Sequence, residues 1–347
     1  MMDISVPYYE DLSRISNSNI GWFLQKGPAF LHKMLTDPPP EEKNPVLERG
    51  TMIHEYLLQP EEFQKDYVIW DKSRPSSAQQ EKFCQAYASS LEIEPNKAIL
   101  EAYKAAYRTK GKTEETMLSE GSKIASTLKD YIDYLKSGDQ RIMIGPYDYQ
   151  MLKKIRNNIE AHKLAKVLLW PGKEDGCLYS KLPYPDGSPG GIIGRWFHEF
   201  HINWDYDGKI KCKSLLDSLT LNFRDKKVTI MDLKTTAKLW HFEESIEMYD
   251  YLRQLDYYSM AVRWYLVSEC GVTEDEIFEW QFEYYIIGID TTGSNEIRVF
   301  KIEQKDVSSR DETILTALDR IAWHQINNKW DHSIEYYIGD GSEILNL

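Results

Sequence analysis

The sequence predicts an α/β fold, in which a mixed central sheet of about five strands carries helices on both faces. Strand-type residues alternate with polar ones from 196 to 236, and strands are expected again at 277–289 and 296–302. Apolar residues instead recur at helical spacing in 244–268 and 311–329. Paired strands interleaved with amphipathic helices are the pattern of a layered α/β domain.

The remaining segments are mostly helical. We expect a single domain, 1–347, in which 75–139 is a helical insertion and 192–268 holds the core hairpins and the helix that follows them. The Pro/Gly-rich stretch 171–191 is expected to be a loop with one short strand at 177–182. Further helices are expected at 46–58, 78–91, 97–107 and 147–169, with one or two helices at 12–35, where Pro28 is a possible break, and a short strand at 67–70.

Length and composition describe a globular protein. The chain has 347 residues, 42% of them hydrophobic and 13% aromatic, which allows a sizeable core. No apolar run approaches the roughly 20 residues that span a bilayer, and no signal peptide is evident, so we expect a cytoplasmic protein with no membrane partner. The four scattered cysteines fit neither a zinc site nor a disulfide framework, which favours a reducing compartment.

The charge of the chain argues against a protein that simply coats DNA. The formal net charge is −13, whereas affinity for phosphates comes chiefly from Lys and Arg. Basic groups remain at 209–213, 226–227 and 153–156, although the last is better explained as a solvated helix face. Because the Debye length is about 8 Å at physiological salt, a local groove can stay positive while distant acids are screened.

The segment 209–236 reads as a hairpin that brings two acids together. If Asn222 and Lys227 close its loop, Asp217 lies opposite Asp232, and facing residues in a strand pair are roughly 4.5–5.5 Å apart at Cβ. Lys234 leaves the same face as Asp232, because side chains alternate along a strand. One small patch would then hold two carboxylates and an ammonium group.

Two facing acids need something to neutralise them, and a divalent cation does this. Carboxylate oxygens suit Mg²⁺ or Mn²⁺. Lys234 could hold a water molecule or offset the charge of a phosphate. A metal ion beside this lysine is an arrangement that can hydrolyse a phosphodiester. The structural alternative is a solvated strand end, since Asp-x-Lys also occurs by chance.

The strand before the hairpin offers a third acid in one of two registers. A two-residue loop at Asp207-Gly208 would put His198 opposite Asp217. A three-residue loop with Gly208 in the left-handed region would instead place Glu199 on the face of Asp217. The polar sides of the two strands coincide only in the second register, which we prefer. A solvated antiparallel face would give the same pattern.

Two helices carry further candidates. His54 lies one turn after Gly50 in the helix 46–58, beside an apolar stripe, where a histidine is often only a satisfied core residue. Gln254 and Tyr258 are i, i+4 neighbours in the helix 244–268, a spacing that ordinary helix packing also explains.

Taken in chain order, these residues resemble the core of the PD-(D/E)XK nucleases. More narrowly, they resemble the exonuclease domain of RecE (exodeoxyribonuclease VIII), a relative of lambda exonuclease. The resemblance covers about residues 12 to 265, and one departure is Gln59, where relatives often carry an acid. The matching positions are Gly50 to His54, Glu199, Lys213, Asp217, the run Asp232-Leu233-Lys234-Thr235-Thr236, and the Gln-xxx-Tyr pair Gln254 and Tyr258.

The resemblance implies a restriction-endonuclease-like sheet and a role for each residue. His54, Asp217, Asp232 and the Leu233 carbonyl would hold Mg²⁺ or Mn²⁺. The catalytic set would be Glu199, Asp217, Asp232 and Lys234. Substrate would be aligned by Gln254, Tyr258 and Lys213.

The resemblance also implies an activity and its partners. The enzyme would degrade double-stranded DNA from its ends, 5′ to 3′, in phage or prophage recombination, beside a single-strand annealing protein. A ring-shaped homo-oligomer is a separate hypothesis, because a closed ring around DNA would reduce the affinity needed from each contact. Three other functions stay open. They are a nuclease of the same fold that acts on flaps or single strands, an inactive nuclease-fold binding module, and a metal-stabilised structural protein.

Overall fold

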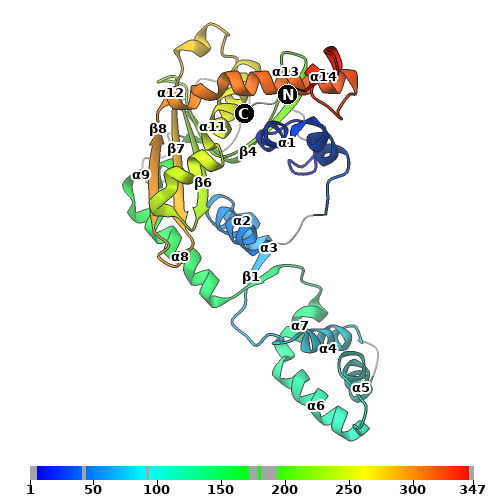
Figure 1. The fold of residues 1–347 in the computed structure, drawn as a ribbon. Helices are drawn as coiled ribbons and strands as arrows, with labels where there is room; N and C mark the ends of the chain where they lie inside the picture. Colours follow the sequence, from blue (N-terminus) through cyan, green and yellow to red (C-terminus); the bar gives the residue numbers. More distant parts are fainter. Residues whose placement is uncertain (1–5, 41–43, 91–93, 172–178, 181–193, 344–347) are drawn as a thin grey trace. The chain divides into compact units, whose positions relative to one another are not determined.

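The computed structural model of the protein describes residues 6–40, 44–90, 94–171, 179–180 and 194–343 (Figure 1). The chain divides into two compact units, Met1–Pro60 with Met151–Leu347, and Glu61–Gln150. The second unit contains the segment 75–139 that the sequence marks as a helical insertion. Organisation of the whole chain as one domain stays a prediction.

The first unit is built on a mixed sheet of six strands in the described residues, in the order β3-β4-β5-β6-β7-β8. Pairs β4/β5, β5/β6 and β7/β8 are antiparallel, whereas β3/β4 and β6/β7 are parallel. The α/β prediction with a mixed central sheet is therefore confirmed. The strands are β3 Tyr179–Ser180, β4 Gly194–Tyr206, β5 Ile210–Asn222, β6 Lys227–Thr236, β7 Gln281–Asp290 and β8 Ile297–Ile302.

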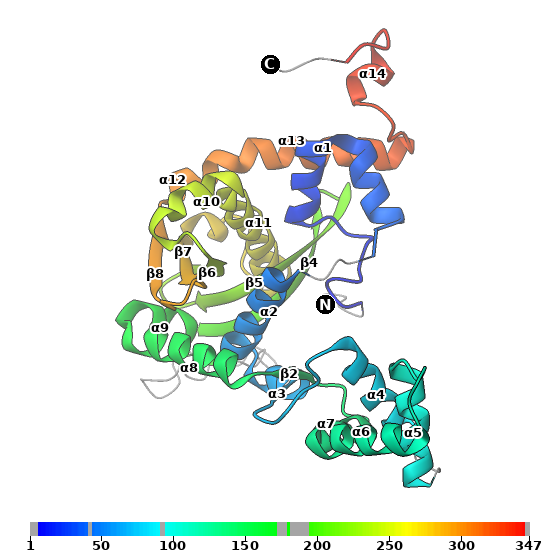
Figure 2. The ribbon, with the colours of Figure 1, turned by 60° about the horizontal axis from the view of Figure 1, so that its bottom comes forward.

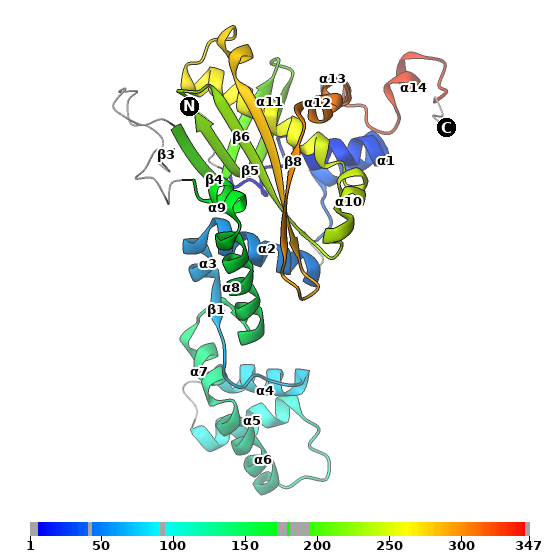
Figure 3. The ribbon, with the colours of Figure 1, turned by 90° about the vertical axis from the view of Figure 1, so that its left-hand side faces the viewer.

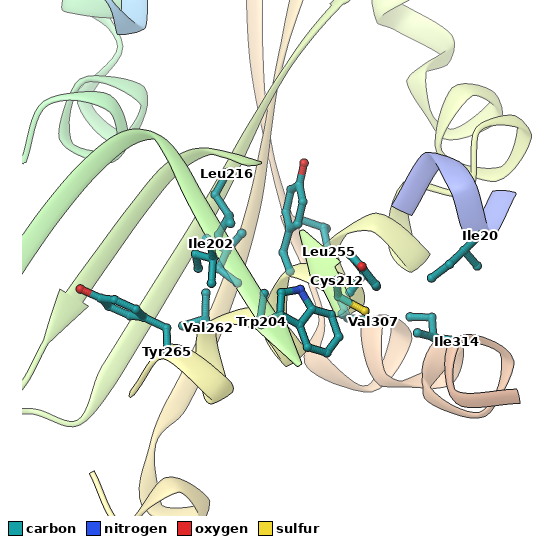
Figure 4. Close-up of a cluster of buried hydrophobic side chains, with 14 of the residues drawn as sticks. Ile20, Ile202, Trp204, Cys212, Leu216, Leu255, Val262, Tyr265, Val307 and Ile314 are labelled. Atoms are coloured by element: carbon teal, nitrogen blue, oxygen red, sulfur yellow. The ribbon is translucent and has the colours of Figure 1, made fainter. Parts of the chain in front are cut away.

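One face of the sheet holds the main hydrophobic core. Three helices cover it: α1 (Asn17–Thr36), α11 (Tyr251–Cys270) and α13 (Asp311–Asn327). Figure 4 shows Ile202, Trp204 and Leu216 from the strands meeting Leu255 and Val262 of α11. The helix α11 also belongs to the crossover between β6 and β7, since parallel neighbours need a long connection.

The opposite face meets the ends of two other helices, α2 (Pro45–Leu58) and α9 (Lys163–Leu169). The His198 ring contacts the Leu58 carbonyl oxygen at 2.9 Å, and Ser218 Oγ donates to the Leu168 carbonyl oxygen at 3.3 Å. Helices thus flank both faces of the sheet, as predicted (Figure 2). The chain also forms α8 Pro146–Ala161, α12 Gln304–Val307, α14 Ile334–Ile338 and the short 3-10 helices Leu239–His241, Glu276–Glu279 and Ser308–Arg310.

Two of the predicted helices are broken in the structure. The helix expected at 244–268 consists of α10 (Phe242–Met248) and α11, because Asp250 between them takes a left-handed φ of 48°. The helix expected at 147–169 ends at Ala161, and His162 begins α9 as its cap, accepting the Ala165 N–H at Nδ1. Periodicity alone spans both breaks, because the apolar stripe continues across them.

The second unit is a small helical body with its own core. The strand β1 (Tyr67–Ile69), labelled in Figure 3, pairs in parallel with β2 (Ile142–Ile144). Phe83, Tyr103 and Ile132 are buried in the helical core. The helices of this part of the chain are α3 Pro60–Asp66, α4 Ala78–Ala88, α5 Pro95–Ala106, α6 Glu114–Thr127 and α7 Lys129–Ser137. Across the described residues, no helix is both long and apolar enough to cross a membrane.

The contact between α11 and α13 buries a carboxyl group whose protonation should affect stability. Burial raises the pKa of Asp256 to about 8, and the neighbouring Asp311 carboxylate adds to the rise. The folded state therefore keeps a proton that the unfolded chain releases near pH 4. The free energy of unfolding should consequently fall as pH rises from about 4 to about 8.

Substitution Asp256→Asn should flatten this pH dependence and stabilise the protein at pH 9 by roughly 1–2 kcal/mol, after allowance for solvent screening. Denaturant unfolding at pH 5 and pH 9 measures the effect. The exposed neighbour Glu312 provides the control, and Glu312→Gln should keep the wild-type slope. An unchanged slope in Asp256→Asn would contradict this explanation.

Candidate metal centre and active site

The hairpin of β5 and β6 has the predicted register. Asn222 pairs with Lys227, and pairing continues to Ser218 and Met231, where it stops. Asp217 and Asp232 are the next facing positions, so they lie where the two strands part. There Asp217 Oδ2 accepts the backbone N–H of Leu233 at 2.6 Å. The carboxylate thus replaces the strand partner that this N–H would otherwise need.

The register between β4 and β5 is the second of the two predicted ones. Tyr206 pairs with Ile210, which leaves a three-residue loop with Gly208 at a φ of 67°. Pairs on either side of the next irregularity, His198 with Ser218 and Phe200 with Leu216, leave Glu199 across from Asp217. The register that would put His198 opposite Asp217 is therefore wrong.

A break in strand periodicity turns Glu199 and Asp217 toward α2. Phe197 and Phe200 lie three positions apart, yet both face the main core with ring centroids 4.1 Å apart. On β5, Leu216 and Leu219 also share that core. Two consecutive residues on each strand must then leave the core face, and Glu199 takes an unfavourable φ of 46°. The three-residue apolar spacing was the sequence signal for this feature, and we missed it.

Helix α2 brings His54 to these acids. Its Nδ1 lies 3.9 Å from Glu199 Oε1 and 3.8 Å from Asp217 Oδ2. One ligand atom from each of the three residues lies within 4.8 Å of the others, a spacing suited to one metal ion. Gly50 lets the helix approach, since a Cβ there would come 3.2 Å from Thr235 Oγ1 of β6.

His198 fixes α2 and α9 against β4. Its Nδ1 lies 2.9 Å from the carbonyl oxygen of Leu58 and its Nε2 lies 2.7 Å from that of Leu169. These are the last residues of the two helices, where the backbone dipoles favour a cation. Because a carbonyl only accepts, the imidazolium form can donate to both. His198 is thus a second residue whose function the sequence did not reveal.

Asp232 belongs to a neighbouring part of the site. It is 2% exposed, its Oδ1 accepts from Gln254 Nε2 at 3.1 Å, and its Oδ2 lies 2.6 Å from Lys234 Nζ. Gln254 Nε2 also lies 2.7 Å from the Tyr258 hydroxyl, so the i, i+4 pair reaches the acid as a unit. Asp232 lies outside the tight group of His54, Glu199 and Asp217.

Lys213 is placed differently from the other predicted residues. Its ammonium group donates to the carbonyl oxygens of Tyr8 at 2.5 Å and Asp11 at 2.6 Å, and it lies over the Tyr8 ring. These contacts tie the N-terminal segment to β5. A role for Lys213 in binding substrate stays a prediction.

The electrostatics of the site call for a cation. Burial raises the pKa of Asp217; His54 opposes the rise and Glu199 adds to it. Burial also raises the pKa of Asp232 to about 6, although the Lys234 ammonium opposes the rise. Burial lowers the pKa of His54, but Asp217 and Glu199 outweigh it and the pKa lies above its usual value.

The residues present fit a divalent metal ion. Three carboxylates and one ammonium group leave two negative charges when His54 is neutral, which a divalent cation balances. Besides its ion pair with Lys234, the buried Asp232 Oδ2 makes no hydrogen bond to the described residues. Carboxylate oxygens with one imidazole suit Mg²⁺ or Mn²⁺.

Binding of Mn²⁺ should depend on Asp217. Substitution Asp217→Asn removes one charged ligand and should weaken binding at least tenfold in isothermal titration calorimetry at pH 7.5. Wild-type affinity should rise between pH 6 and pH 8, because protons compete for His54 and the acids, whose pKa values are raised.

The exposed Asp207 in the turn before β5 is a matched control, and Asp207→Asn should bind Mn²⁺ as wild type does. Equal Mn²⁺ affinity in Asp217→Asn and wild type would exclude this site as the metal centre.

Comparison with known proteins gives little information about function. No protein-family model and no curated protein matches the chain. Among solved structures, the chain is similar to a protein from Eubacterium rectale named "Putative exonuclease", at 12% identity, with 100% of this chain and 95% of that chain covered and a TM-score of 0.45. At that score the likeness carries no argument about function.

Proposed function

We propose that this chain is a divalent-metal-dependent deoxyribonuclease that hydrolyses phosphodiester bonds at the ends of duplex DNA. One observation carries the proposal: His54, Glu199 and Asp217 converge beside the buried Asp232–Lys234 pair, where β5 and β6 part. Acids, an imidazole and an ammonium group in one place are what metal-assisted phosphoryl transfer requires.

In this proposal, His54, Glu199 and Asp217 would hold the metal, with Asp232 and the Leu233 carbonyl as further candidates. A bound divalent ion polarises the phosphoryl oxygen and lowers the pKa of water. Asp217 is already oriented by the Leu233 N–H, and its cost of reorganisation on binding is therefore small.

Lys234 would position the attacking water or offset charge on the phosphate. Its ammonium group is held by Asp232 Oδ2 at 2.6 Å and lies 4.9 Å from the centre of the Tyr251 ring. Burial lowers the pKa of Lys234, but Asp232 and Asp217 outweigh it and keep the group charged. Gln254 and Tyr258 would keep Asp232 in place and align the DNA strand.

The resemblance to RecE-like exonucleases supports the choice of duplex ends, the 5′ to 3′ direction, the recombination setting and the annealing partner. The net charge of −13 makes a ring attractive, because enclosure of DNA reduces the affinity needed from each contact.

A cleavage assay tests the proposal. With Mg²⁺ or Mn²⁺, the protein should degrade linear duplex DNA but leave closed circles intact, and EDTA should stop it. Substitution Lys234→Ala should lower the rate by roughly 100-fold or more, because the residue acts at the reacting phosphate. A thermal unfolding curve checks that the variant is folded.

Lys238 is an exposed lysine four residues further on, paired with Glu244, and Lys238→Ala should keep wild-type activity. Degradation of circles would indicate an endonuclease instead. Degradation of single strands or flaps alone would indicate a nuclease of the same fold that acts on those substrates. No cleavage with either metal would leave the binding module as the better function.

A further inference from the structure

Two large apolar side chains project into solvent close to the site. Met248 ends α10 and is 68% exposed, and Tyr249 follows it at 60% exposed. Single exposed apolar residues are common and need no function. Here, however, the pair lies at the helix break immediately before α11, the helix that supplies Gln254 and Tyr258.

The turn that presents these side chains is firmly held. Asp250 takes the left-handed conformation, which residues other than Gly, Asn and Asp rarely adopt. Its carboxylate lies 3.2 Å from Arg253 Nε and 2.8 Å from Arg310 Nε, and Arg253 Nη1 donates to the Asn17 carbonyl oxygen at 2.7 Å. The exposed pair is therefore mounted on a turn fixed by α1, α11 and the start of α13, rather than on a loose loop.

Ring contacts lead from Tyr249 to the catalytic lysine. Tyr249 stacks on Tyr251 with ring centroids 5.7 Å apart and planes inclined by 23°. Tyr251 in turn lies 4.9 Å from Lys234 Nζ. The single ring of Tyr251 thus lies between Tyr249 and Lys234.

We propose that Tyr249, flanked by Met248, is a stacking platform for the nucleobase next to the cleaved phosphate. The inference rests on the proposed nuclease function. Every base offers a π face that stacks on an aromatic ring without regard to sequence. A base inside a duplex has both faces covered, so the platform suits a terminal or unpaired base, and it would favour frayed ends over internal positions.

A double-mutant cycle between protein and DNA tests this. Binding of fluorescent duplexes with short overhangs is measured by anisotropy in Ca²⁺, which occupies oxygen sites. Each duplex ends either in a normal nucleotide or in an abasic one, placed at the 5′ or the 3′ terminus. Tyr249→Ala should weaken binding of the normal end about tenfold, and Tyr249→Phe should not.

The wild-type protein should bind a duplex with an abasic nucleotide at one terminus about tenfold more weakly than the normal duplex. Tyr249→Ala should bind that abasic duplex no more weakly than the wild type does. Phe278 is 83% exposed and lies just before β7, at the end of the β6/β7 pair remote from Asp232. Phe278→Ala is therefore the control for loss of an exposed aromatic residue and should bind normally.

Four results would overturn the platform, and the last would overturn the nuclease function with it. If Tyr249→Ala bound DNA with wild-type affinity, the platform would be rejected. The nuclease function would still stand, provided that linear DNA is cleaved and Lys234→Ala is inactive. If Tyr249→Ala weakened the binding of normal and abasic ends equally, no base would be stacked on Tyr249. A change of oligomeric mass in Tyr249→Ala, with binding unchanged, would make the pair a protein contact. Absence of both cleavage and end binding in wild type would remove the nuclease function as well.

Discussion

The hydrogen bond from the Leu233 backbone N–H to Asp217 lies where the two strands of a hairpin stop pairing, and the arrangement of the acids depends on it. Up to Ser218 and Met231 the strands satisfy each other's backbone groups. Beyond that point β6 continues beside β7 as far as Thr236, and on the β5 side the Asp217 carboxylate accepts the Leu233 N–H. A charge-assisted bond of 2.6 Å to rigid backbone fixes this carboxylate before any ligand arrives. The other charged groups of the site are then arranged around it.

Much of this geometry follows from local rules that a sequence displays. The short polar loop between Asn222 and Lys227 sets the register of one hairpin, and Gly208 in the left-handed region sets the other. Because facing positions in an antiparallel pair are set by the register of its loop, those two loops suffice to bring Asp217 opposite both Asp232 and Glu199. The helix carrying His54 could be expected from periodicity, and Gly50 permits its close approach to Thr235. Register does not determine which of these charged groups bind a metal ion. That choice depends on the chemistry of the groups.

The features that sequence reasoning missed depend on contacts between distant segments. The left-handed Glu199 is stable only because two apolar pairs on adjacent strands share one core. His198 reads as an ordinary strand residue until the ends of α2 and α9 meet it. Likewise, nothing local shows that Asp250 interrupts a helix, since its two arginine partners lie 3 and 60 residues away. Tertiary partners decide these conformations, and the break at Glu199 alone among them leaves a signal in the sequence, the three-residue spacing of Phe197 and Phe200.

The central claim is that a divalent ion binds where β5 and β6 part. Its most direct test is an anomalous difference map from crystals grown with Mn²⁺. The claim predicts a peak about 2.0–2.4 Å from a carboxylate oxygen of Asp217, with His54 or Glu199 as a second ligand. An ordered site with no peak there, while Mn²⁺ occupies another place on the protein, would contradict it.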